Sequence, residues 1–344
     1  MGIERLFEPP ALGQPVPVAP GILWLRLPLP FALDHINVWL IEEADQYTLV
    51  DTGAGLPNVA ALWEEIERTL FARKPLGRII VTHAHPDHIG MAGPLARKHG
   101  VNVHMSSAEY FMARGLCANL PGFDAHSLAT FMASHGLAHE EKAEETQKAR
   151  GGLFARLVPE PPLGFQRIRH GDELVIGEHT WRCMAGFGHS PEHISLVCES
   201  LGVMISGDML LPTISTNVSV YAIEPEGNPL LAFLKSVQAM ATLPDRLMVL
   251  PSHGVPFKGI HDRCAQLLRH HDHRLNELLD ALKAQPLSAR QAISVLFKRE
   301  MDGHQMSFAM GEAVAHLHYL WRKGLARRTQ QNGVWVFEAT PEAL

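Results

Sequence analysis

Residues 78–90, RIIVTHAHPDHIG, join a short apolar run to a cluster of three histidines and one aspartate. The apolar run predicts a buried β-strand, and the polar cluster follows it directly. Alternate side chains of a strand point the same way, and the loop after the strand brings the next side chains alongside. We therefore expect four side chains to converge here: His83, His85, Asp87 and His88. Because imidazole and carboxylate groups bind zinc, iron and manganese, the stretch predicts a metal site with room for two ions.

Three more polar residues also follow apolar runs. His189 lies in GFGHSPEH, Asp208 in VMISGDML and His253 in MVLPSHG. A single histidine at such a position is more often a structural residue than a ligand. The repeated placement nevertheless favours one shared site. Seven ligands exceed what one tetrahedral ion uses, so the sequence predicts two metal ions per chain.

The surrounding pattern predicts a mixed fold of helices and strands. Two apolar runs between Gly21 and Gly53 predict an antiparallel meander. A helix over 56–74, the strand of the metal motif, a helix over 91–99 and a strand over 101–105 then predict a βαβ-like unit. Further strands are predicted at 166–168, 173–176, 180–185, 194–198, 203–206 and 247–250, and further helices at 230–243 and 261–284.

Two regions differ from this pattern. Residues 107–162 contain amphipathic helical segments, the last over 139–152, and predict a helical insertion. At the C-terminal end, two helical segments and a hairpin with an Asn-Gly turn predict a small winged-helix module. The expected domains are a catalytic domain over 1–284, with the insertion at about 107–162, and a winged-helix-like domain over 285–344.

Composition excludes several classes of protein. The 344 residues are 46% hydrophobic and 19% charged, a globular balance with no predicted membrane span. The formal charge of -6 gives no overall basic field for nucleic acid. The four cysteines form no CxxC pairs, which disfavours disulfides and cysteine zinc sites. The first 21 residues lack the pattern of a secretory signal, which favours a cytoplasmic protein.

The ordered set from Asp51 through the His83–His88 motif to His253 resembles the metallo-β-lactamase superfamily over about Gly21–Gly259. The resemblance implies an α+β fold, a four-layer αββα sandwich with a metal site at one edge of the sheets. The histidine at position 88 resembles the pattern of glyoxalase II and its relatives, which carry histidine there, whereas true β-lactamases usually carry another residue. Only about 45 residues separate Asp208 from His253, too few for the inserted domain of the RNA-cleaving β-CASP branch.

Carried over residue by residue, the resemblance implies two ligand sets that share one carboxylate. The first metal would be bound by His83, His85 and His189, and the second by Asp87, His88 and His253. Asp208 would bridge both ions, and Asp208 and Asp87 would take part in catalysis. Three further residues would lie behind the ligands and orient them: Asp51, Glu192 and His193. Glu192 departs from the glyoxalase-like pattern, because GHSPEH stands where those sequences have GHTPGH.

The expected activity is hydrolysis of a small-molecule substrate. Two metal ions, with zinc favoured over iron or manganese, lower the pKa of a shared water toward about 7 and polarise a carbonyl. A thiolate leaving group needs little protonation, since the thiol pKa is about 8.5, and this favours a thioester such as an acyl-CoA or an acylglutathione. Three other functions stay open: a ribonuclease or other nucleic-acid phosphodiesterase, an iron enzyme similar to sulfur dioxygenases, and a metal-responsive DNA-binding regulator.

The remaining features predict structure more than chemistry. From residue 286 onward, seven Lys+Arg against five Asp+Glu give +2, a weak signal for nucleic acid. A structural or dimerising role is expected for this module, so a homodimer is left open. The run His270, His271 and His273 is predicted to form a solvated helix face. The apolar side chains of the insertion are expected to pack between helices, with a lid over an acyl chain as the alternative: Phe111, Met112, Leu116, Phe123, Phe131, Met132, Phe154 and Leu157.

Overall fold

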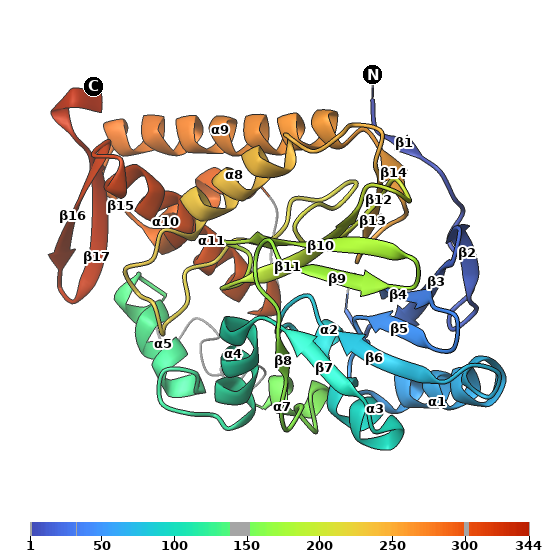
Figure 1. Ribbon diagram of the computed structural model, residues 1–344. Helices are drawn as coiled ribbons and strands as arrows, with labels where there is room; N and C mark the ends of the chain where they lie inside the picture. The colour runs from blue at the N-terminus through green and yellow to red at the C-terminus, as the bar shows by residue number, and fades with distance from the viewer. Residues whose placement is uncertain (1, 32, 138–151, 299–302, 344) are drawn as a thin grey trace. The chain divides into compact units, whose positions relative to one another are not determined.

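The computed structural model describes residues 2–31, 33–137, 152–298 and 303–343 (Figure 1). The chain forms two compact units. The first unit contains Met1–Ala118, Phe154–Thr216 and Val237–Cys264; the second contains Asn119–Leu153, Asn217–Ser236 and Ala265–Leu344. The predicted domain limits, 1–284 with an insertion at 107–162 and then 285–344, stay a prediction. Most of the helical segment predicted at 139–152 lies outside the described residues.

Two seven-stranded sheets form the first unit. One has the order β2-β3-β4-β5-β6-β7-β8, and its strands are Val16–Ala19, Ile22–Pro28, His35–Glu42, Tyr47–Val50, Leu76–Ile80, Asn102–Met105 and Gln166–Arg167. The other has the order β1-β14-β13-β12-β11-β10-β9, from strands β1 (Glu4–Arg5), β9 (Glu173–Ile176), β10 (His179–Gly186), β11 (His193–Cys198), β12 (Val203–Gly207), β13 (Met248–Pro251) and β14 (Phe257–Lys258). Each sheet combines antiparallel and parallel pairs; β5, β6, β7 and β8 run parallel.

The two sheets pack face to face on one apolar core. Trp24 and Trp39 of the first sheet lie in the same buried cluster as Trp181 and Ile205 of the second. Alternating side chains place these residues on the inner faces, as period-two patterning requires. The predicted sandwich of two sheets is confirmed.

Helices lie against this sandwich. Helix α1 begins with Pro57 at its first turn, and Val59, Trp63 and Ile66 form its buried side. The described helices of the unit also include a π-helical turn after α1 and a one-turn helix inside the metal motif. Their bounds are α1 Pro57–Ile66, π-helix Glu67–Phe71, α2 Pro86–Ile89, α3 Ala92–His99, α4 Ser107–Cys117 and α7 Leu153–Leu157. Sequence patterning predicted a loop where α2 forms, because four residues are too few to show a helical period.

The second unit contains a C-terminal module of helices and a small sheet. Its sheet has the order β15-β17-β16, formed by Leu287–Ser288, Val334–Ala339 and Ala326–Gln331. The helices are α5 Ala125–Ser134, α10 Ala289–Leu296, α11 Gly303–Arg322 and the 3-10 turn Pro341–Ala343, while α8 Pro229–Met240 and α9 Ile260–Ala284 contribute residues to both units. The predicted helices and terminal hairpin are present; the winged-helix assignment stays a prediction.

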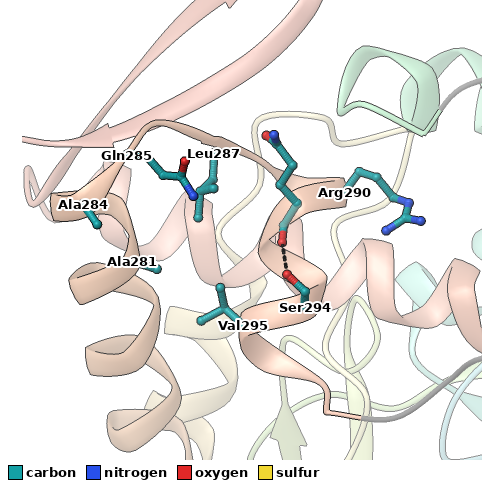
Figure 2. Close-up of a pocket in the computed structure, with 8 residues that line it drawn as sticks. Ala281, Ala284, Gln285, Leu287, Arg290, Ser294 and Val295 are labelled. Carbon is teal, nitrogen blue, oxygen red and sulfur yellow. Dashed lines mark hydrogen bonds between the residues drawn. The ribbon is translucent and has the colours of Figure 1, made fainter.

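A shallow cavity of about 640 Å³ lies in the second unit, at the end of α9 and along α10 (Figure 2). Its lining mixes apolar side chains such as Leu287 and Val295 with Gln285 and Arg290. The Ser294 hydroxyl on its wall donates to the carbonyl of Gln291 at 2.8 Å. Among the described residues, no helix is both long enough and apolar enough to cross a membrane.

Candidate metal centre

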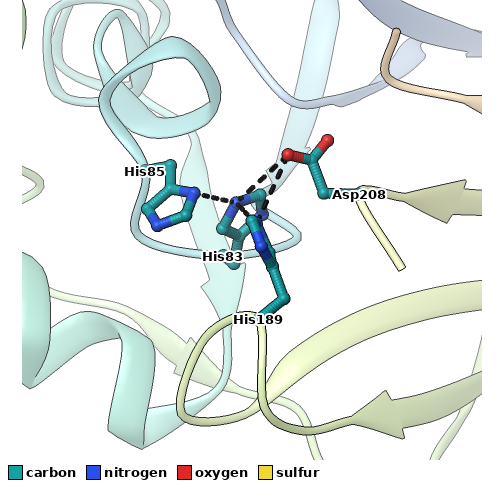
Figure 3. A group of neighbouring side chains, drawn as sticks. All are labelled: His83, His85, His189 and Asp208. Atoms are coloured by element: carbon teal, nitrogen blue, oxygen red, sulfur yellow. Dashed lines mark hydrogen bonds and ion pairs between the residues drawn. The ribbon is translucent and has the colours of Figure 1, made fainter. Parts of the chain in front are cut away.

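Four of the predicted ligands form one tight group in the first unit (Figure 3). Nε2 of His83 lies 2.8 Å from Nδ1 of His85 and 3.2 Å from Nε2 of His189. Oδ2 of Asp208 lies 3.3 Å from the same His189 nitrogen. His83 and His85 follow strand β6, whereas His189 follows β10, so three imidazoles from two sheets converge on one point. This first group could hold a metal ion.

A second group lies beside the first. Asp87, His88 and His253 each offer one ligand atom within 4.8 Å of the others. Oδ2 of Asp87 lies 3.6 Å from Nε2 of His88 and 3.5 Å from Nε2 of His253. Asp87 and His88 come from α2, where Pro86 occupies the first helical position after the extended backbone of His85.

Asp208 faces both groups with different oxygens. Oδ2 lies 3.3 Å from Nε2 of His189, while Oδ1 lies 3.5 Å from Nε2 of His88 and 3.4 Å from Nε2 of His253. A carboxylate with one oxygen toward each group has the geometry of a ligand shared by two ions. The structure thus brings together all seven residues predicted as ligands.

Hydrogen bonds orient two histidines of the second group. His88 donates Nδ1–H to Oδ2 of Asp51 at 2.8 Å, and His253 donates Nδ1–H to the carbonyl of His35 at 2.8 Å. Each ring therefore carries a proton on Nδ1 and turns its Nε2 toward the site, where this nitrogen can bind a metal ion once it has lost its own proton. His35 is held in turn, because its own Nε2 accepts from the amide of Gly254 at 2.8 Å.

Asp51 also holds the strand end that leads into the motif. It accepts hydrogen bonds from the amide of Thr82 at 2.8 Å and from the Thr82 hydroxyl at 2.9 Å. Its backbone has φ 61°, in the left-handed region that few side chains adopt. The carboxylate contacts Nδ1 of His88, on the side of the ring away from the site, and its role in orienting this ligand stays a prediction. Sequence reasoning did not identify Thr82 or His35.

Glu109 is a buried carboxylate that the sequence did not indicate. It lies on α4, fully inaccessible, and its Oε2 accepts from the amide of Ala84 at 2.8 Å. Its Oε1 accepts from the amide of Glu192 at 2.7 Å. Burial raises the pKa of Glu109, although these amides oppose the shift. Glu192 contributes its backbone to this contact. A glutamate three residues after a capping serine was the only local signal.

His193 lies directly behind Asp208. Its Nε2 accepts from the amide of Asp208 at 3.2 Å, and its ring centroid is 4.9 Å from that of His83. A Cβ at Gly207 would lie 2.1 Å from the same Nε2, so only glycine allows this approach. His193 thus contacts the backbone of Asp208, and an orienting role for it stays a prediction.

The electrostatics of the site favour a bound cation. Burial opposes the charged form of His88, but the carboxylates of Asp51, Asp87 and Asp208 outweigh it and hold the pKa of His88 well above its ordinary value. The pKa of Asp208 is held well below its ordinary value, because His253 and His88 outweigh the effect of burial. The negative charges of these buried carboxylates thus favour positive charge beside them, either on a protonated histidine or on a bound cation.

Two buried atoms show that the donor set fits metal ions. Nε2 of His88 and Oδ1 of Asp208 have no hydrogen-bond partner among the described residues. Buried polar atoms without partners are costly, and these two atoms lie 3.5 Å from each other. Nitrogen and carboxylate oxygen are donors for zinc, iron and manganese, so a divalent ion in each group would satisfy these atoms.

Two sequence expectations concern residues outside the site. His270, His271 and His273 were predicted to form one exposed helix face, and this is wrong for His271, which is fully buried. Its Nδ1 lies 3.3 Å from Nε2 of His316, and its ring packs on Phe233. Of the apolar side chains of the predicted insertion, Met112, Phe131, Met132 and Leu157 are buried, whereas Phe111 is 64% exposed. The lid over an acyl chain stays an untested alternative.

Comparison with known proteins agrees with this geometry. Residues 32–253 match the family described as "Metallo-beta-lactamase superfamily", and residues 275–340 match "Metallo-beta-lactamase-like, C-terminal domain". The Bacillus subtilis protein named "Probable metallo-hydrolase YqjP" is 24% identical over 87% of this chain and 92% of its own length. The human "Acyl-coenzyme A thioesterase MBLAC2" is 26% identical over 55% of this chain and 63% of its own length.

Solved structures give the same result. A beta-lactamase domain protein from Burkholderia ambifaria is 41% identical, with a TM-score of 0.91 over 98% of both chains. A metallo-beta-lactamase family protein from Thermus thermophilus is 28% identical, with a TM-score of 0.78 over 93% of this chain and 99% of its own. With seven candidate ligands in two adjoining groups, the chain belongs to the metallo-beta-lactamase superfamily and is a metal-dependent hydrolase.

Proposed function

We propose that this hydrolase cleaves thioesters of small molecules at a centre of two divalent metal ions, zinc being the favoured metal. The observation that carries the proposal is Asp208, whose two oxygens face the two ligand groups separately. His83, His85 and His189 would hold one ion, and Asp87, His88 and His253 the other. Two such ions supply Lewis acidity that activates water and polarises a carbonyl near neutral pH.

The protein's own residues keep this centre ordered and place a proton acceptor in it. Hydrogen bonds to Asp51 and His35 fix the ring protons of His88 and His253 on Nδ1. Asp208 is the more enclosed of the two catalytic carboxylates, whereas the Asp87 side chain is 17% exposed. Asp87 is therefore the carboxylate better placed to take a proton from the attacking water.

Leaving-group chemistry favours a thioester. Water oxygen bonds to the acyl carbon, the carbon–sulfur bond breaks, and sulfur leaves as a thiolate that takes its proton from solvent. Since a thiol pKa is about 8.5, this departure needs no strong protein acid. Amines and alkoxides are far more basic and need one.

Relatives and the surface near the ligands support an acyl substrate. Similar proteins include the acyl-coenzyme A thioesterase above and a Rhodobacter capsulatus hydroxyacylglutathione hydrolase, 23% identical over 79% of this chain. Phe187, two residues before His189, is 44% exposed, and Ile214, six residues after Asp208, is 45% exposed. Exposed apolar side chains next to ligands in the chain fit the binding of an acyl group.

The test is a substrate panel on one metal-loaded sample. Acyl-CoA esters of several lengths, an acylglutathione, a lactone and a structured RNA are offered, with thiol release followed by a disulfide dye. We expect thioester cleavage that disappears on chelation and returns with zinc. His253→Ala should abolish it, whereas His273→Ala, a 71% exposed histidine in the second unit, should not. RNA cleavage without thioester cleavage, or oxygen uptake with a persulfide by an iron-loaded sample alone, would overturn the proposal.

A further inference from the structure

Glu109 connects two loops that carry candidate ligands of the same metal ion. Ala84, whose amide donates to Oε2 at 2.8 Å, stands between His83 and His85. The amide of Glu192, which donates to Oε1 at 2.7 Å, lies three residues after His189. The two amides come from positions 25 and 83 residues away in the chain. One carboxylate thus touches the backbone of both loops that must meet to form the first group.

The position of Glu109 on its helix makes this contact distinctive. Ser106 caps α4, and its hydroxyl accepts from the amide of Glu109 at 3.3 Å. A glutamate at this third helical position usually turns back to the amide of the capping residue. Here both carboxylate oxygens instead accept from amides of other segments, and the side chain is fully buried. A buried carboxylate is costly unless such hydrogen bonds satisfy it, so a role confined to helix capping does not explain its burial.

We propose that Glu109 is a positioning residue that fixes the spacing of His83, His85 and His189 by holding the two loops through their amides. The inference rests on the proposed metal centre and adds a residue that acts on the first ion without touching it. Both oxygens must be acceptors, because each faces an N–H group. A glutamine at this position would turn its NH₂ toward one of the two amides and break that contact.

The experiment compares metal binding by Glu109→Gln, Glu109→Asp and the unchanged protein. The control is Glu178→Gln, the same chemical change at an exposed residue between β9 and β10. Metal-free samples are titrated with Zn²⁺ against a chromophoric chelator, and Co²⁺-loaded samples are compared by their visible absorption, which reports ligand geometry. Circular dichroism of the metal-free samples checks that each variant is folded.

We expect Glu109→Gln to weaken binding of the first ion by about 10- to 100-fold and to shift the Co²⁺ spectrum. Glu109→Asp, one methylene shorter, should lie between it and the unchanged protein, and Glu178→Gln should match the latter. If Glu109→Gln does not fold, a folded Glu109→Asp must show the weaker binding and the altered spectrum. Native affinity and spectrum in a folded Glu109 variant would overturn the inference, even if its melting temperature fell, because that result describes a purely structural role.

This outcome is separable from that of the proposed function. Failure of the unchanged protein to bind two ions, or to cleave any thioester, counts against the proposed function. Unaltered metal binding by folded Glu109 variants, with an active unchanged protein, counts against the role of Glu109 alone.

Discussion

His88 donates its Nδ1–H to Oδ2 of Asp51 at 2.8 Å, and neither side chain is accessible to solvent beyond 1%. Asp51 follows β5 and His88 lies in α2, so the contact joins the ends of two adjacent parallel strands. The backbone of His88 is held as well, since the hydroxyl of Thr52 donates to the carbonyl of His88 at 2.7 Å. The orientation of a candidate ligand is therefore fixed on both its backbone and its ring.

Replacing Asp51 by asparagine should weaken binding of the second metal ion more than binding of the first. The left-handed backbone at Asp51 tolerates asparagine, so the strand end can keep its conformation. The neutral amide removes the charge that orients His88, and supporting residues of this kind contribute about 10- to 100-fold to metal affinity. Elemental analysis after graded dialysis against chelator measures the effect. Asp45→Asn, in the exposed turn after β4, is the matched control, and equal retention of both ions in the two variants would contradict this role.

Substitutions of Asp208 and of Asp87 should have different effects on metal occupancy and turnover. Asp208 faces both groups, so Asp208→Ala should lower occupancy of both ions together with turnover. Among the described candidate ligands, Asp87 groups with His88 and His253, so Asp87→Asn should keep the first ion and lose about 10²- to 10⁴-fold in turnover. Metal content and thiol release are measured on the same samples. Full activity of Asp87→Asn at full occupancy would show that Asp87 is neither an essential ligand nor a proton acceptor.

Basic residues of the C-terminal module should stabilise that module and should not bind nucleic acid. The Arg328 guanidinium lies 4.0 Å from the ring of Trp321 and 4.1 Å from that of Trp335, and it pairs with Glu226 at 2.9 Å. Cation–π contacts contribute about 0.5–2 kcal/mol, so Arg328→Ala should lower the free energy of unfolding by at least about 1 kcal/mol.

Arg327 provides the comparison, because it is 63% exposed and pairs only with Glu338 among the described residues. Such surface pairs contribute about 0–1 kcal/mol, so Arg327→Ala should change stability little. Denaturant unfolding measures both variants, and thioester turnover should be kept in both. Salt-dependent RNA binding that disappears in either variant would instead support the nuclease alternative.

The ligands were predictable because each one lies within a few residues of the end of a strand. An apolar run that ends in His or Asp can be recognised from the sequence alone, and the sandwich brings the strand ends together. Glu109 could not be found in this way, since its partners Ala84 and Glu192 are distant in the chain and contribute only backbone amides. No side-chain pattern reports a contact of that kind.

His271 shows a different reason for error. The run of histidines was interpreted by its polarity, but the buried positions of α9 recur at helical spacing: Cys264, Leu267, His271, Leu275, Leu278 and Leu282. His271 occupies the apolar stripe, whereas His273 lies two residues away on the exposed side. Helical periodicity therefore predicts the burial of His271 better than its residue type does.

Buried histidines should make the second unit sensitive to acid. Burial lowers the pKa of His271 to about 3 and those of His316 and His318 to about 4. Above pH 6.5 these groups are neutral whether the chain is folded or unfolded, and they do not affect stability. As the pH falls from about 6.5 to 4, the unfolded chain takes up protons that the folded chain refuses, so the free energy of unfolding decreases. Because one pKa unit corresponds to about 1.4 kcal/mol, the upper limit is about 3 kcal/mol each for His316 and His318 and about 5 kcal/mol for His271.

Glu312 should act in the opposite direction on the same helix. Burial raises its pKa to about 7, although Arg274 opposes the shift. Between about pH 4.5 and 7 the folded state keeps a proton that the unfolded state releases, so raising the pH through this range lowers stability. Glu312→Gln, which keeps a neutral side chain of similar size, should therefore raise the melting temperature at pH 8. It also removes the gain that Glu312 gives on acidification, so the loss of stability from pH 6 to 4.5 should become larger. His316→Gln should instead reduce the loss of stability at acid pH, because it removes a group that takes up a proton only when the chain unfolds. Melting curves of metal-free protein from pH 4.5 to 8.5 separate the two effects, and a pH profile that neither variant alters would show that other groups control the stability of this unit.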